Sequence, residues 1–274
     1  MHQQDFLYRK KAEKTIMLVF VTFLGLIWSI PIIAAVNKAL AFNGWQNFYD
    51  IIFGDIGGIK LHITYLNSFI IALQHAFFVV AVSSLAGYGF AYLDFKYKEG
   101  FYFIVLMFMA VPATSILVPL FFITRELGLR DTLVGISLPE AALTLPFGVL
   151  LMRNFADGIS RSYIEAAIID GAVHWKIFFQ IFMPIAKPAA INLATLSMMW
   201  SMQDFLFPSL FLIDPEKTTA AQAVMRFKEY LGATPDDIGR YNASLVLLAI
   251  PALIIIVFGL RFITQGLTSG GVKE

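Results

Sequence analysis

The sequence predicts an all-α membrane protein with about six transmembrane helices. Hydrophobic residues make up 58% of its 274 residues, charged residues make up 14%, and the mean hydropathy is +0.74. Soluble domains carry about 25% charged residues. Six apolar stretches in the chain are near or above the roughly 20 residues that a helix needs to cross a bilayer. Since no water reaches the hydrocarbon, such segments must satisfy their backbone groups internally, as helices.

The predicted spans follow one another along the chain. They are residues 15–36, 66–93, 101–124, 133–152, 189–213 and 242–260. The first span has 22 residues without a charge, which is longer than the roughly 7 to 15 residues of a signal-peptide core. We therefore predict a retained anchor. The chain reads as one transmembrane domain, 15–263, between an N-terminal segment, 1–14, and a C-terminal tail, 264–274.

Lysine and arginine placement predicts the orientation, because basic residues near span ends stay preferentially in the cytoplasm. The N-terminal segment carries four of them, which puts it inside: Arg9, Lys10, Lys11 and Lys14. Alternating six spans from there places the loop 157–188 on the same side, together with its own basic residues Arg161, Lys176 and Lys187. Both termini and this loop are thus predicted to be cytoplasmic.

The loop 157–188 has the features of a helix, turn, helix elbow. Ser162 and Glu165 have the spacing of a capping box, which predicts that a helix begins near Tyr163. Gly171 can take the left-handed conformation that ends a helix, and a second helix is expected to run until Pro184. That helix has an i, i+3, i+4, i+7 aromatic face formed by Trp175, Phe178, Phe179 and Phe182. An ordinary amphipathic loop on the bilayer surface would explain this face, but not the Asp-Gly break.

Motifs for catalysis are absent from the sequence. No Gly-rich phosphate loop ending in Gly-Lys-Ser/Thr is present, so the chain is not expected to bind ATP by itself. The histidines lack metal-site spacing, there is no cysteine, and no basic run suggests nucleic acid. We predict a non-catalytic protein that holds no metal or cofactor of its own.

Polar groups inside predicted spans are costly enough to be candidates for function. Asp204, in the fifth span, lies beside Gln203 and between the aromatic residues Trp200 and Phe205. Flat apolar faces and polar partners of this kind suit a substrate pathway. Asp204 could equally bond to a neighbouring helix or cap a helix break near Pro208.

The loop also resembles a known motif. The order and spacing of its residues resemble the "EAA" loop of permease subunits of ATP-binding-cassette (ABC) importers, at Glu165, Ala166, Ala167, Asp170, Gly171, Ala172, Ile181 and Pro184. The stretch 200–208 resembles a segment of carbohydrate-type permeases, although Met202 and Gln203 stand where that pattern has Trp and Asn. Asn67-Ser68 and the segment 128–132 look like the maltose-type subgroup.

The resemblance implies a type I importer permease in the bacterial cytoplasmic (inner) membrane. It implies a heterodimer with a second permease subunit, two ATPase subunits that bind ATP and magnesium, and an extracytoplasmic solute-binding protein. The substrate would be a carbohydrate, either a mono- or oligosaccharide or a related polyol. The EAA-type residues Glu165, Ala166, Ala167, Asp170, Gly171, Ala172 and Pro184 would couple the chain to the ATPase, and Trp200, Gln203, Asp204 and Phe205 would face the substrate.

Other functions stay open on the sequence. A permease of the same class could carry another solute, such as a phosphorylated polyol or a peptide. An ion-coupled secondary transporter should show more intramembrane ionisable residues than Asp204, His75 and Glu140. A membrane-embedded enzyme would need a convergent catalytic set, which the sequence does not display.

Overall fold

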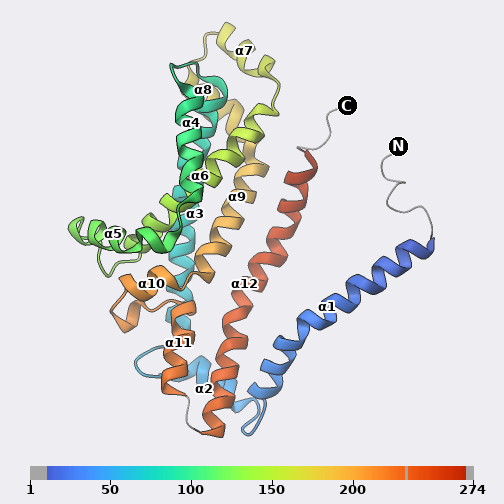
Figure 1. The fold of residues 1–274 in the computed structure, drawn as a ribbon, viewed down its shortest axis with the longest axis vertical. Helices are drawn as coiled ribbons and strands as arrows, with labels where there is room; N and C mark the ends of the chain where they lie inside the picture. The colour runs from blue at the N-terminus through green and yellow to red at the C-terminus, as the bar shows by residue number, and fades with distance from the viewer. Residues whose placement is uncertain (1–10, 232–233, 270–274) are drawn as a thin grey trace.

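A computed structural model describes residues 11–231 and 234–269 as an assembly of helices, without a β-strand in this part of the chain (Figure 1). Four helices there are long and apolar enough to cross a membrane: Glu13–Ala39 within α1 (Lys11–Ala39), α3 (Leu61–Tyr92), α6 (Val134–Asp157) and the continuous helix His174–Gln203. The sixth predicted span lies within α12 (Pro235–Ser269). The helical membrane fold predicted from composition is confirmed.

The third predicted span is not one straight helix. It divides into α4 (Lys98–Met107) with the short η1 (Phe108–Ala110), and α5 (Ala113–Glu126), which meet at an angle of 102°. Pro112 lies at the break in an extended conformation. A proline disfavours a helical conformation in the residue before it and donates no hydrogen bond. As a result, α5 points away from the bundle (Figure 1).

The fifth predicted span also differs from the structure at both ends. The helix does not stop at Pro184, because α8 (His174–Ile177), the π-helical η2 (Phe178–Phe182) and α9 (Met183–Gln203) form one continuous helix. In a regular α-helix the ring of Pro184 would clash with the carbonyl four residues earlier. The wider π turn directly before Pro184 accommodates it. At the other end the chain breaks at Asp204, and α10 (Leu206–Phe211) follows.

The centre of the fold is α3, which packs most extensively against α6 and α9. The approach of α3 and α6 is close because glycines replace larger side chains at the contact. A Cβ at Gly87 would lie 2.7 Å from Cβ of Met152, and one at Gly148 would clash with the hydroxyl of Ser83. Small residues of this kind allow membrane helices to pack backbone against backbone.

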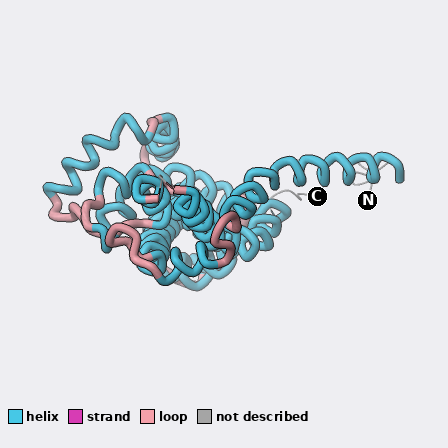
Figure 2. The backbone as a smooth tube through the Cα atoms, turned by 90° about the horizontal axis from the view of Figure 1, so that it is seen from below, coloured by secondary structure: helices cyan, strands magenta, loops and turns pink. Residues whose placement is uncertain are grey.

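Among the described residues, the first helix packs against little besides one other helix. The most apolar stretch of α1 is 0% buried in the structure, and its N-terminal half extends away from the other helices (Figure 2). Only α12 makes an extensive contact with it. The apolar surface of α1 is therefore left for lipid or for another subunit.

The connecting elements gather at the two ends of the molecule. The short helices α2 (Gln46–Phe53) and α11 (Ala220–Tyr230) lie at one end, with the start of α12 (Figure 1). The opposite end carries α7 (Arg161–Ile169), α8 and the start of α4. This arrangement fits the alternating spans of the sequence analysis. Which end faces the cytoplasm stays a prediction, and residues 1–10 and 270–274 of the two terminal segments lie outside the described residues.

Candidate functional site

The elbow predicted at residues 157–188 is present, but its first helix begins earlier than the capping box implied. Ser160 is the N-cap of α7 and Arg161 is the first helical residue, so Ser162 lies inside the first turn. The hydroxyl of Ser162 lies 2.8 Å from that of Ser160 instead of capping the helix. The side chain of Glu165 is consequently exposed on α7, and the predicted capping role of Ser162 is wrong.

The end of α7 was correctly predicted at Gly171. This glycine has a φ of +78°, which only glycine adopts without a side-chain penalty. Its N–H donates to the carbonyl of Ile168 at 2.9 Å, and the N–H of Ala172 donates to the carbonyl of Ala167, also at 2.9 Å. These two bonds form the Schellman motif of a helix end, and they fix the angle at which the chain leaves Asp170.

The second half of the elbow is attached to α3 by aromatic rings. Of the predicted aromatic face, Phe178 and Phe182 are buried, whereas Trp175 and Phe179 are exposed. Tyr88 of α3 packs against both buried rings, with centroid distances of 5.5 and 5.2 Å, and its hydroxyl lies 3.1 Å from Nδ1 of His174. The elbow is therefore braced against the C-terminal end of α3.

The outer surface of the elbow has the character of a docking surface. Small and polar residues lie exposed on it, including Glu165, Ala166 and Asp170, while Ala167 is buried below them. A hollow of about 220 Å³ separates the two helices and is lined by Asp170, Gly171, Ala172, Lys176 and Gln180, among others. Pro184 is exposed further along the same continuous helix.

A second polar site lies between the spans, and the structure brings together there the three ionisable residues that the sequence leaves scattered. His75 of α3, Glu140 of α6 and Asp204 after α9 line one cavity of about 160 Å³. His75 is 1% exposed and Glu140 is 6% exposed. Ring nitrogen Nδ1 of His75 lies 2.9 Å from the carbonyl of Ser197, and Nε2 lies 3.0 Å from the hydroxyl of Thr144.

The contacts of Glu140 were not foreseen. The hydroxyl of Ser201 donates to Oε2 of Glu140 at 2.6 Å. Ser197 and Ser201 lie four residues apart on α9, so they face the same side of the helix. That spacing of polar residues inside an apolar span was the available signal in the sequence, because it marks a polar face that must find partners in neighbouring helices.

The four predicted pathway residues end up in different environments. Asp204 ends α9 and accepts hydrogen bonds from the N–H groups of Leu206 and Phe207, both at 3.1 Å. The expectation that it caps a helix break is therefore confirmed. Trp200 lines the cavity, and Gln203 and Phe205 are exposed beside it.

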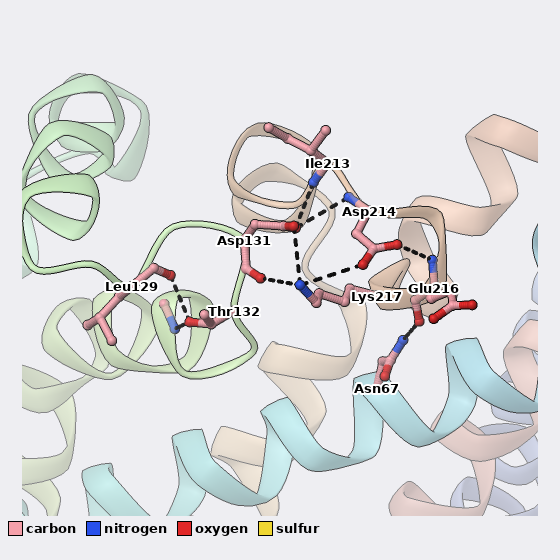
Figure 3. A network of polar contacts seen from close by, with 9 residues as sticks. Asn67, Leu129, Asp131, Thr132, Ile213, Asp214, Glu216 and Lys217 are labelled. Atoms are coloured by element: carbon pink, nitrogen blue, oxygen red, sulfur yellow. Dashed lines mark hydrogen bonds and ion pairs between the residues drawn. The ribbon is translucent and has the colours of Figure 1, made fainter.

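A polar network joins three segments that are separate in the sequence (Figure 3). Asp131 accepts from the N–H groups of Ile213 and Asp214 at 3.0 and 3.3 Å, and its carboxylate lies 3.2 Å from Nζ of Lys217. Asn67 of α3 donates to the carbonyl of Glu216 at 2.8 Å. We call these residues, Asn67, Asp131, Asp214 and Lys217, the clasp. Their distances in sequence hid their proximity.

The charges of the clasp support one another. Partial burial works against ionisation of Asp131, but hydrogen bonds from the amides of Ile213 and Asp214 and from Lys217 outweigh it and lower the pKa of this carboxyl. The hydrogen bond to Asp131 is also the main reason why the pKa of Lys217 is raised. Asp131 has a φ of +55°, a conformation that aspartate and asparagine tolerate better than most residues. The connection between α5 and α6 is thus fixed to the segment that precedes α11.

Comparison with known proteins agrees with this architecture. Residues 80–267 match the family described as binding-protein-dependent transport system inner membrane component. A probable ABC transporter permease protein, YurM of Bacillus subtilis (strain 168), is 32% identical over 211 residues, which cover 76% of this chain and 69% of the relative. The arabinooligosaccharides transport system permease protein AraQ of the same organism is 31% identical over 236 residues, covering 86% of this chain and 80% of the relative.

A solved structure shares the fold. It is that of a bacterial ABC transporter involved in the import of the acidic polysaccharide alginate, and one of its chains superposes with a TM-score of 0.75. The match covers 92% of this chain and 97% of that chain at 19% sequence identity.

Proposed function

Because the chain belongs to the family of binding-protein-dependent transport system inner membrane components, we propose that it forms half of the translocation pathway of an ATP-driven importer for a carbohydrate. The observation that carries this proposal is the elbow. It combines a helix that exposes Glu165 and Ala166, a fixed glycine turn and a rigid attachment to the spans. Such a surface is suited to binding a subunit outside the membrane.

The elbow is proposed to transmit motion from an ATPase subunit. Glu165, Ala166 and Asp170 would contact the ATPase, while Gly171 and Ala172 fix the turn. Besides the short link from α6 to α7, two connections lead from the elbow into the membrane. One is the aromatic contact of Phe182 with Tyr88 of α3, and the other is the continuous helix from His174 to Gln203. Movement of the elbow would therefore displace α3 and α9 together.

The partners follow from this mechanism. ATP and magnesium would be bound by two separate ATPase subunits, and an extracytoplasmic binding protein would deliver the substrate. A second permease, most simply a different chain, would complete the pathway, and the unburied α1 offers an apolar surface for it. The elbow and both termini would lie on the cytoplasmic side, as the basic residues predict.

The carbohydrate assignment rests on relatives and on the pathway residues. AraQ is named for arabinooligosaccharide transport, and another relative, SmoH of Agrobacterium fabrum (strain C58 / ATCC 33970), for sulfoquinovosyl glycerol transport. Trp200 and Phe205 provide aromatic faces, and Gln203 and Asp204 provide polar partners for hydroxyl groups. Together these features favour a sugar over a peptide or an ion-coupled solute.

Gentle extraction of the tagged chain from its native membrane tests the proposal. A second permease and an ATPase should be recovered with it, and the reconstituted complex should take up sugar only with ATP and the binding protein. Asp170→Lys should reduce recovery of the ATPase, whereas substitution of the exposed Glu126 on α5 should not. Uptake that needs a proton or sodium gradient and no ATP would refute the proposal.

A further inference from the structure

The short helix α2 leaves one face uncovered at its end of the molecule (Figure 1). Asn47 and Ile51, which lie one turn apart, are buried against the rest of the chain. Trp45, Tyr49 and Phe53 repeat at the same spacing of four residues and are 75%, 58% and 72% exposed. Residues four apart share one face of a helix. This side of α2 therefore presents large aromatic side chains away from the chain.

The exposed face lies close to the boundary of the membrane. The apolar stretch of α1 ends at Val36, and the polar residues Asn37 and Lys38 follow it. Residues 40–45 then join α1 to α2. They turn back on the end of α1, where the N–H of Ala41 donates to the carbonyl of Lys38 at 3.2 Å. Tryptophan and tyrosine are enriched at the headgroup level of membranes, so this face suits the headgroup layer better than bulk water.

A polar hollow opens beside two of these rings. It has a volume of about 390 Å³ and lies between α2, the turn that follows α2, and α12. Tyr49 and Phe53 line it, and the charged side chains of Asp50, Asp55 and Arg240 line it as well. Sites for small organic groups have volumes from about 300 Å³ upward. The hollow is therefore large enough for such a group, and it combines the aromatic face with both signs of charge.

The two carboxylates of the hollow are only partly paired within the chain. Oδ1 of Asp50 accepts a hydrogen bond from the side chain of Gln46 at 2.8 Å, and Oδ1 of Asp55 accepts one from the N–H of Gly58 at 2.7 Å. Among the described residues, neither Oδ2 atom has a hydrogen-bonding or ion-pairing partner. Each carboxylate thus keeps one oxygen for a donor from outside the chain.

Arg240 of α12 supplies the opposite charge. Its Nη2 donates to Asp237 at 3.0 Å, whereas its Nε has no hydrogen-bonding partner among the described residues. A guanidinium group has five N–H donors in a planar fork, and this geometry matches a phosphate group. Arg240 therefore has donors left for an anionic group, in the same hollow as the two carboxylates.

The headgroup of a zwitterionic phospholipid has the complementary chemistry. Its ammonium group would bind Asp50 and Asp55, and its phosphate group would bind Arg240. Because two carboxylates face one guanidinium, the hollow disfavours a ligand with a net negative charge. A primary ammonium group also brings three N–H donors, whereas a trimethylammonium group brings none.

We propose that the hollow between α2 and α12 binds the headgroup of one zwitterionic phospholipid of the phosphatidylethanolamine type, while the exposed aromatic side chains of α2 lie in the headgroup layer around it. The site does not involve the transported solute, so it goes beyond the proposed function. A lipid bound there would hold α2 to the start of α12, the helix against which α1 also packs.

Native mass spectrometry of the complete transporter tests this site. The delipidated complex is titrated with phosphatidylethanolamine, phosphatidylcholine and phosphatidylglycerol of identical acyl chains, and the masses of the intact complex give the number and affinity of bound lipids. The variants are Asp50→Asn combined with Asp55→Asn, and Arg240→Gln. The matched controls are Asp236→Asn and Lys60→Gln, because each removes one exposed charge that does not line the hollow.

The wild-type complex should bind one phosphatidylethanolamine about tenfold more tightly than phosphatidylglycerol. Phosphatidylcholine should lie between them, because it has the positive charge but not the N–H donors. The double aspartate variant should lose this preference, since the carboxylates select the ammonium group. Arg240→Gln should weaken the binding of all three lipids several-fold, since all three carry the phosphate group. Both controls should behave as the wild type does.

Three results would overturn the site. The first is a preference for phosphatidylethanolamine that persists in the double aspartate variant, and the second is equal binding of phosphatidylethanolamine and phosphatidylglycerol by the wild type. The third is competition by soluble glycerophosphoethanolamine at the same concentration as the lipid, which would show that the hollow binds a free zwitterion. None of these results bears on ATP-dependent uptake, so the proposed function is tested separately.

Discussion

The turn at Gly171 gives the sharpest prediction, because only the backbone conformation, and no steric clash, disfavours a side chain at this position. A Cβ added at Gly171 would meet no atom within 4 Å, yet the φ of +78° disfavours any side chain. Alanine in a left-handed conformation costs roughly 1–2 kcal/mol, and β-branched valine costs more. A cost of one to two kcal/mol changes a conformational equilibrium by a factor of about 5 to 30.

We therefore expect Gly171→Ala to weaken coupling between ATP hydrolysis and uptake, and Gly171→Val to weaken it further. Both variants should insert and assemble normally, because the change lies outside the spans. Gly171→Asn is the matched control, since asparagine tolerates the left-handed conformation. ATP hydrolysis and sugar uptake are measured together in proteoliposomes, and the ratio of sugar imported to ATP consumed is compared.

From highest to lowest, this ratio is expected in the order wild type, Gly171→Asn, Gly171→Ala, Gly171→Val. Wild-type coupling in the Val variant would show that the Schellman turn does not transmit force. An Asn variant as impaired as Val would show that the site requires the absence of a side chain for contact with the ATPase, and not the backbone conformation of Gly171.

Three further predictions concern packing and charge. Gly87→Ala should destabilise the chain by about 1–3 kcal/mol, because its Cβ would lie 2.7 Å from that of Met152, whereas Gly89→Ala, with its nearest neighbour 3.8 Å away, should be tolerated in thermal unfolding. Tyr88→Ala should loosen the elbow from α3 at a cost of about 3–5 kcal/mol, which would be measured as faster hydrogen exchange in α8. Tyr88→Phe keeps the ring and should cost only about 1 kcal/mol. Equal exchange rates in the two variants would contradict the role of the aromatic ring. Asp131→Ala should lower the thermal midpoint more than Asp131→Asn does. Since the folded pKa of Asp131 is lowered, the stabilising contribution of its carboxylate should be complete above about pH 4 and disappear as the pH falls through that lowered pKa. A stability difference between the wild type and Asp131→Asn that does not change with pH would contradict this prediction.

The spans and the elbow could be predicted from the sequence because both depend on local signals. Length and apolarity define a membrane helix whatever surrounds it, and a glycine after a short helix has few other uses. The break at Pro112 was missed because hydropathy continues across it. The helix through Pro184 was missed because proline is a strong signal for the end of a helix, whereas the π turn that accommodates this proline has no comparable sequence signal.

The sites formed by residues far apart in the sequence could not be predicted from local sequence signals. His75, Glu140 and Asp204 come from three helices, and their convergence depends on how α3, α6 and α9 rotate against one another. The close glycine contacts between α3 and α6 help to set that rotation. The clasp likewise depends on the fold, since Asp131 and Lys217 are joined only after α10 has returned beside the start of α6.

One helix connects the two candidate sites. The continuous segment from His174 to Gln203 has 30 residues, so it is about 45 Å long, with the elbow at its start and the polar cavity of His75, Glu140 and Asp204 at its end. Ser197 and Ser201, one turn apart near that end, contact His75 and Glu140 respectively. Because both contacts lie on the same face of α9, a rotation or shift of this helix would strain them together. A movement of the elbow would then alter the position of Glu140 relative to Asp204 in the polar cavity. The helix that the two sites share is thus sufficient to transmit movement from one to the other.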